Sequence, residues 1–302
     1  MSEWTMLLSD YTFQIIAIGS TLLGITSGVI GSFVVLRKQG LIGDGISHAA
    51  LPGVVLAFLM TGSKDTGLLL LGALITGLMA MGLIHVIVKL TKIPFDSALA
   101  TVLSVFFGGG VVLLTYAQKI PNANQAGLDR FIYGQTAAML KRDVYFIGGM
   151  GIAIVVIILL LWKELKVMCF DQAFAKTIGI PVNRLERLLA CLIVLTIVMG
   201  LQAVGVILMS AMLIAPAIAA RQWTKHLGTM LVLSAVFGGL SGIMGTFMSS
   251  VIEKAPTGPL VVVCSTFITV MSLLIAPNRG ILSKIYKRKK DKHLLNQKSE
   301  VI

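Results

Sequence analysis

The sequence predicts an all-α polytopic membrane protein, a compact bundle of eight or nine transmembrane helices. First, 56% of the 302 residues are hydrophobic and only 13% are charged, too little charge to cover a soluble protein of this length. Second, the apolar residues gather in runs of about 20, the length that crosses the hydrocarbon core. Third, several of the 31 glycines recur at small-xxx-small spacing, which allows close helix packing in lipid.

The apolar runs define nine candidate membrane segments. The sequence QAVG alone marks the boundary between the sixth and the seventh, so one of these two could be short or broken, and eight spans is the alternative. By length and hydrophobicity, the segments are 13–36, 41–61, 66–90, 96–117, 143–164, 184–201, 203–220, 227–250 and 258–276.

Lysine and arginine between the segments predict the orientation. They follow the first, third, fifth, seventh and last segments, whereas the loops TGSKD and EKAPTG are nearly neutral. Because cytoplasmic loops are enriched in basic residues, we expect the N-terminus outside and the C-terminus in the cytoplasm. The loop 118–142 is also basic and departs mildly from this pattern.

The C-terminal residues 284–302 carry seven Lys or Arg against two acidic residues. The positive-inside rule favours a basic cytoplasmic tail over a nucleic-acid-binding segment. We therefore expect a transmembrane permease domain over 1–283, followed by this tail. The sequence contains no P-loop, H-E-x-x-H or G-x-S-x-G motif, and its three cysteines have no paired spacing, so no enzyme class is indicated.

Glycine pairs mark where helices can approach one another. Gly24 and Gly28 form a small-xxx-small pair, as do Gly238 and Gly242. Tight packing is the favoured interpretation, and points of flexion during transport are the alternative.

A short amphipathic segment interrupts the spans at 165–187. Phe170, Phe174 and Ile178 fall on one side of it and polar residues on the other, while Gly179 can end a helix there. An interfacial helix on the lipid surface is one interpretation. A docking element for a cytoplasmic partner is the other.

The stretch GLIGDGISHAALPG contains the candidate site. Asp44 and His48 are four residues apart, so they share one face of a helix, and a carboxylate and an imidazole there can hold one divalent cation. Pro52 has no N–H, which frees the carbonyl of His48 as a further ligand. Ionisable groups are costly within a membrane segment, so their presence there indicates a functional site. The alternatives are that Asp44 caps a helix from a loop and that His48 is a packing residue.

Three stretches together, FVVLRKQGLIGDGISHAALPGV, FDQAFAKTIGIPV and AVGVILMSAMLIAPAIAAR, resemble the manganese/zinc/iron permease family of bacterial ABC importers. The resemblance runs from about Phe33 to Pro277. It implies a plasma-membrane permease that forms a dimer, with a second copy or a paralogue, and sits on a separate ABC ATPase. It also implies an extracellular metal-binding lipoprotein that delivers the ion.

The resemblance also assigns residues. Asp44 and His48 match the family's metal-holding D-x-x-x-H pair, and Asp171, Ala175 and Gly179 lie in the segment, about 170–180, that matches the ATPase-coupling helix. The resemblance also matches Met209, Ser210 and Met212 to a helix that lines the pathway, and Pro52 is expected to adjoin the pathway as well.

Ligand chemistry favours Mn²⁺ as the transported ion, since carboxylate, carbonyl and water suit manganese and no cysteine lies near Asp44 in the sequence. Zinc is the alternative, with iron behind it, and no permanently bound cofactor is expected. A secondary transporter or channel without an ATPase is the rival class, but it leaves the amphipathic segment unexplained.

Overall fold

The computed structural model describes residues 10–63, 65–119, 134, 139–252, 255–277 and 280–283. Within these ranges the chain is helical, without strands, which confirms the predicted fold class. The basic tail 284–302, most of the loop 118–142 and the N-terminal end lie outside the described residues.

The helices follow the predicted apolar runs closely. In chain order they are α2 (Tyr11–Leu36), α3 (Ile42–Ala49), α4 (Leu51–Thr61), α5 (Thr66–Leu90), α6 (Phe95–Lys119), α8 (Lys141–Leu160), α9 (Trp162–Phe170), α10 (Gln172–Thr177), α11 (Val182–Val204), α12 (Val206–Trp223), α13 (Leu227–Val251) and α14 (Thr257–Ile275). Among the described residues, seven spans are long and apolar enough to cross a membrane, one of them formed by α3 and α4 together. The predicted sixth and seventh segments are α11 and α12, which are not among these seven and which meet at Gly205.

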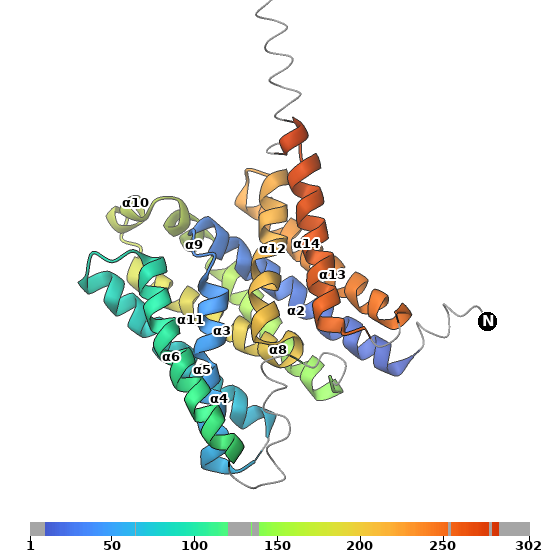
Figure 1. Cartoon of the computed structure of the whole chain (residues 1–302). Helices are drawn as coiled ribbons and strands as arrows, with labels where there is room; N and C mark the ends of the chain where they lie inside the picture. The colour runs from blue at the N-terminus through green and yellow to red at the C-terminus, as the bar shows by residue number, and fades with distance from the viewer. Residues whose placement is uncertain are drawn as a thin grey trace, which may run out of the picture.

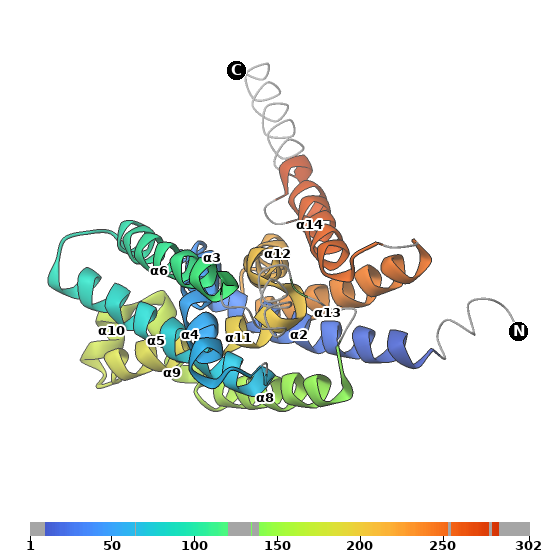
Figure 2. The same ribbon diagram turned by 60° about the horizontal axis from the view of Figure 1, so that its bottom comes forward.

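Two groups of helices lie on either side of a buried centre (Figures 1 and 2). The helices α3–α6 form one side and α2, α13 and α14 the other, with α11 and α12 between them. The middle of α11 is almost entirely buried, as the exposures of Leu189, Ile193 and Ile197, at 1% or less, show. By contrast, only 22% of the membrane windows of α6 and α8 are buried, so these helices present most of their surface outward.

Glycine brings α2 and α13 into backbone contact. An ideal Cβ placed on Gly24 would lie 2.2 Å from the carbonyl oxygen of Gly238, and one placed on Gly28 would lie 2.3 Å from that of Ser234. Beside this contact, the hydroxyls of Ser32 and Ser234 are hydrogen-bonded at 2.8 Å. The packing interpretation of these glycines is therefore confirmed.

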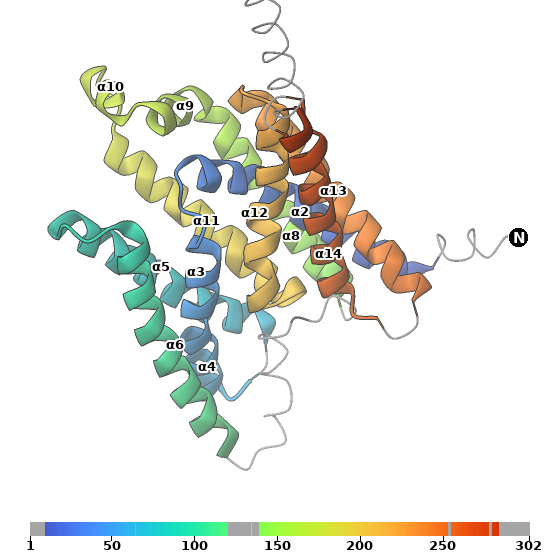
Figure 3. The same cartoon turned by 45° about the horizontal axis from the view of Figure 1, so that its top comes forward.

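The short helices α9 and α10 project from one end of the bundle, as Figures 1 and 3 show, at the opposite end from the α4–α5 connection. The predicted fifth segment, 143–164, runs four residues too far, because α8 ends at Leu160 and the chain turns into α9. The amphipathic segment is thus two helices rather than one.

Candidate metal-ion site

The second membrane span is broken between His48 and Pro52. α3 ends at Ala49 and α4 begins at Leu51. Proline cannot donate to the carbonyl four residues earlier, which is that of His48, and this accounts for the break. The hydroxyl of Thr76 on α5 lies 3.4 Å from the carbonyl oxygen of Ala50 and so supports the join from a neighbouring helix.

Asp44 and His48 lie together on one face of α3. Nε2 of His48 is 3.3 Å from Oδ1 of Asp44, as the i, i+4 spacing predicts. Asp44 lies in the first turn of the helix, whose N-cap is Leu41, so the alternative that Asp44 caps a helix from a loop is wrong. The Asp44 side chain is 46% exposed and that of His48 is 23% exposed, which leaves the pair accessible from outside the chain.

Neighbouring helices fix the position of this pair. The rings of His48 and of Phe107 on α6 pack edge-to-face, with centroids 4.7 Å apart and planes at 75°. Gly45 packs against Leu99 on the same helix, and an ideal Cβ there would lie 2.5 Å from that side chain. His48 is therefore a packing residue as well as a candidate ligand, and the two interpretations do not exclude each other.

One chain supplies few ligands. Within the described ranges, no group of three or more His, Cys, Asp or Glu side chains is placed to hold a metal ion. Structural zinc has four ligands, and manganese prefers six in an octahedron. Two side chains and the carbonyl of His48 fall short of both numbers, so an ion held here needs water or groups from another chain.

The structure places the other predicted pathway residues in different surroundings. Pro52 is buried, and Gly110 of α6 approaches it so closely that an ideal Cβ on this glycine would lie 2.9 Å from Cδ of the proline. Met209 and Met212 are fully buried in the core of the chain. Ser210 is half-buried and lies against Gly43 of α3. A pathway role stays a prediction for all four residues.

The predicted coupling residues lie on or beside α10. Asp171 caps the helix, with its Oδ1 accepting the N–H of Phe174 at 2.9 Å. Ala175 is fully buried, and Gly179 follows the helix with φ of +81°, a conformation that favours glycine. The helix spans 172–177, shorter than the predicted 170–180. Phe170, Phe174 and Ile178 are more than half exposed, so an apolar surface is open at this end of the bundle.

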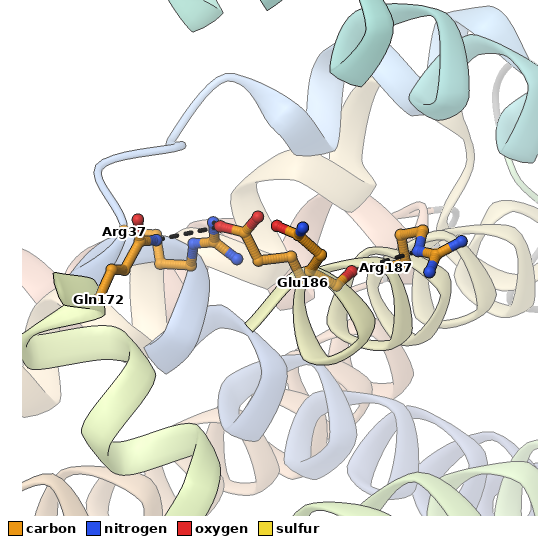
Figure 4. Close-up of polar contacts among 5 residues, drawn as sticks. Arg37, Gln172, Glu186 and Arg187 are labelled. Atoms are coloured by element: carbon orange, nitrogen blue, oxygen red, sulfur yellow. Dashed lines mark hydrogen bonds and ion pairs between the residues drawn. The ribbon is translucent and has the colours of Figure 1, made fainter. Parts of the chain in front are cut away.

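A polar cluster beside α10 has no counterpart in the sequence analysis. Oε1 of Glu186 on α11 accepts hydrogen bonds from Arg37 at the end of α2, at 2.6 Å, and from Gln172 on α10, at 3.0 Å (Figure 4). Arg37 and Glu186 are 149 residues apart, and no motif joins them. Burial raises the pKa of the nearby Cys169 thiol to about 11, with the charge of Arg37 acting in the opposite direction.

A helical membrane bundle with an ionisable pair on a broken span and a short helix projecting from one end defines the membrane component of a transporter. Residues 9–276 match the model of the ABC 3 transport family. The chain belongs to this family, and it is the membrane permease component of an ABC transporter.

Two relatives and one solved structure cover almost all of this chain. The zinc transport system membrane protein TroC of Treponema pallidum is 48% identical over 94% of this chain and 95% of its own length. The manganese transport system membrane protein MntC of Bacillus subtilis is 48% identical over 94% of this chain and 65% of its own. The structure of PsaBC from Streptococcus pneumoniae in complex with Fab has a TM-score of 0.80 and 32% identity, and the match covers 95% of this chain and 98% of that one.

Proposed function

We propose that this chain is the permease subunit of an ATP-driven importer of divalent transition-metal ions, with Mn²⁺ as its main cargo, in a bacterial plasma membrane. The observation that carries the proposal is the Asp44–His48 pair, which is open on one face of a broken membrane span. In this proposal the two side chains and the His48 carbonyl hold the ion in transit.

The choice of manganese over zinc rests on the donor set. A carboxylate, an imidazole and a carbonyl form a harder site than one that contains thiolate, and no cysteine joins the pair in a cluster among the described residues. One relative is named for zinc and another, equally identical, for manganese. His48→Cys therefore offers a direct test, because a thiolate should move the preference of the permease toward Zn²⁺.

A second permease copy or a paralogue completes the site in this proposal. The pair supplies fewer ligands than either metal takes, and the Asp44 carboxylate is almost half exposed on the surface of the chain. Two such surfaces facing each other would bring two carboxylates and two imidazoles to one ion.

In this proposal the two remaining partners bind at opposite ends of the bundle. The exposed apolar side chains on and beside α10 dock on a separate cytoplasmic ABC ATPase, with Asp171, Ala175 and Gly179 shaping that helix. A metal-binding lipoprotein delivers the ion at the opposite end. The N-terminus is outside, and the C-terminus, with the basic tail 284–302, is in the cytoplasm.

The test uses the permease reconstituted in liposomes with its ATPase. Asp44→Ala, Asp44→Asn and His48→Ala should each lower Mn²⁺ uptake at least about tenfold, since even outer-shell changes cost that much in metal sites. The control His85→Ala replaces a half-buried histidine that bonds its own helix at Met81, and it should transport normally. Wild-type uptake by assembled Asp44→Ala and His48→Ala complexes would refute the site.

The ATPase interface is tested separately. Ala175→Leu forces a large side chain into a fully buried position of α10, and it should leave ATP hydrolysis running while uptake falls. Normal uptake by this variant would show that the ATPase does not act through α10.

A further inference from the structure

One carboxylate oxygen links three segments at the end of the bundle that carries α10. Oε1 of Glu186 accepts from Nη2 of Arg37 and from Nε2 of Gln172 (Figure 4). One donor is on the C-cap residue of α2 and the other on the first residue of α10, while the acceptor lies near the start of α11. We call these three residues the Glu186 clamp.

The clamp is partly withdrawn from water. The Arg37 side chain is 13% exposed and that of Glu186 is 22% exposed. A charge-assisted hydrogen bond of this kind is stronger than a fully exposed ion pair, which contributes little. Because both donors share one oxygen, a displacement of α10 changes the position that Arg37 can hold.

The clamp stands at the corner, residues 37–41, that joins α2 to α3. Lys38 adopts φ of +57°, the left-handed region that is unfavourable for a side chain, and it is the only non-glycine residue with positive φ in the described part of the chain. The N–H of Ile42 donates to the carbonyl of Gln39 at 3.0 Å, so the corner is hydrogen-bonded directly into α3. Asp44 follows two residues later.

From these contacts we infer that Glu186 is a positioning residue, which ties α10 to the corner 37–41 and thereby to Asp44 and His48. The inference rests on the proposed function, in which α10 meets the ATPase and the pair holds the ion. A displacement of α10 during ATP hydrolysis then moves Arg37 through the Glu186 carboxylate. The strained corner 37–41 transmits this displacement to α3.

The experiment compares uptake with hydrolysis in the reconstituted permease–ATPase complex. Glu186→Gln removes the charge while nearly preserving the shape, and Mn²⁺ uptake per ATP hydrolysed should fall about fivefold or more, within the usual range of coupling between sites. Gln172→Ala cuts only the bond to α10 and should lower the same ratio. The control Arg187→Gln alters an exposed arginine that bonds Asn183 of its own helix, and it should leave the ratio unchanged.

Exchanging the charges of Arg37 and Glu186 distinguishes a loss of coupling from general damage to the protein. The double variant Arg37→Glu with Glu186→Arg restores an ion pair, and the Gln172 amide can turn so that its oxygen accepts from the new arginine. With both contacts kept, uptake per ATP should recover to within about twofold, as expected for residues that act as a unit. An unchanged ratio in Glu186→Gln, or an exchanged pair that stays uncoupled although it assembles, would overturn the inference. Neither result would affect the proposed function, which depends on loss of uptake in Asp44→Ala.

Discussion

The contact between α2 and α13 is so close that a single methyl group should disrupt it. An ideal Cβ on Gly238 would lie 2.1 Å from the carbonyl oxygen of Gly24, whereas an ordinary contact needs at least 3.4 Å. In Gly238→Ala the two backbones must therefore separate by about 1.3 Å, the difference between these distances. The obstacle is a backbone oxygen, which cannot turn aside as a side chain can.

Overpacking of a well-packed site costs about 1–3 kcal/mol. We expect Gly238→Ala to fall at the upper end, because the whole length of two helices must yield. A loss of about 2–3 kcal/mol corresponds to a drop of roughly 5 °C or more in Tm for a chain of this size. Gly24→Ala should cost a similar amount, and the double variant should cost less than the two losses added together, since both methyl groups open the same contact.

The assay is thermal unfolding of the purified permease in detergent. Gly149→Ala provides the matched control, because an ideal Cβ on this helical glycine of α8 meets nothing within 4 Å. Its Tm should equal or exceed that of the wild type, in line with the higher helix propensity of alanine. Equal Tm values for Gly238→Ala and Gly149→Ala would refute the argument that glycine is required for this approach.

Three further measurements test other parts of the structure. Asp171→Ala removes the cap of α10 at a cost of about 1 kcal/mol, so the amide protons of that helix should exchange faster, and unchanged exchange would contradict the cap. Because burial raises the pKa of Cys169 from 9.0 to about 11, its alkylation, with the other cysteines replaced, should keep accelerating as the pH rises past 9; a plateau near pH 9 would contradict the shift. Ser63→Cys should react with an impermeant thiol reagent in intact cells and Thr177→Cys only after permeabilisation, and the reverse pattern would overturn the predicted orientation.

Most of the fold was predictable because apolar length is a strong signal in membrane proteins. The break in the second span followed from Pro52, and the end of α10 from Gly179. The turn at Leu161 between α8 and α9 was missed, because the apolar run 152–162 continues through it and contains no glycine or proline to mark a break.

The candidate site was predictable only where its residues are close in sequence. Helical spacing alone placed Asp44 beside His48. The helix α12 is apolar on all sides, so periodicity could not tell that Met209 and Met212 point into the core. The bond between Arg37 and Glu186 depends on how distant helices pack, and single-sequence patterns carry no information about that.

The join at Ala50 changes the energetics of bending within the membrane. Separating an N–H from its carbonyl in hydrocarbon costs several kcal/mol, since no water takes the place of the lost partner. Pro52 has no N–H, so the helical hydrogen bond from residue 52 to the His48 carbonyl cannot form. Bending the span at this point therefore does not break that hydrogen bond. The half of the span before the join is α3, which carries both candidate ligands, and the half after it is α4, which packs against α5. A rotation of α3 about this join would therefore reorient both candidate ligands without the cost of breaking a helical bond at the His48 carbonyl.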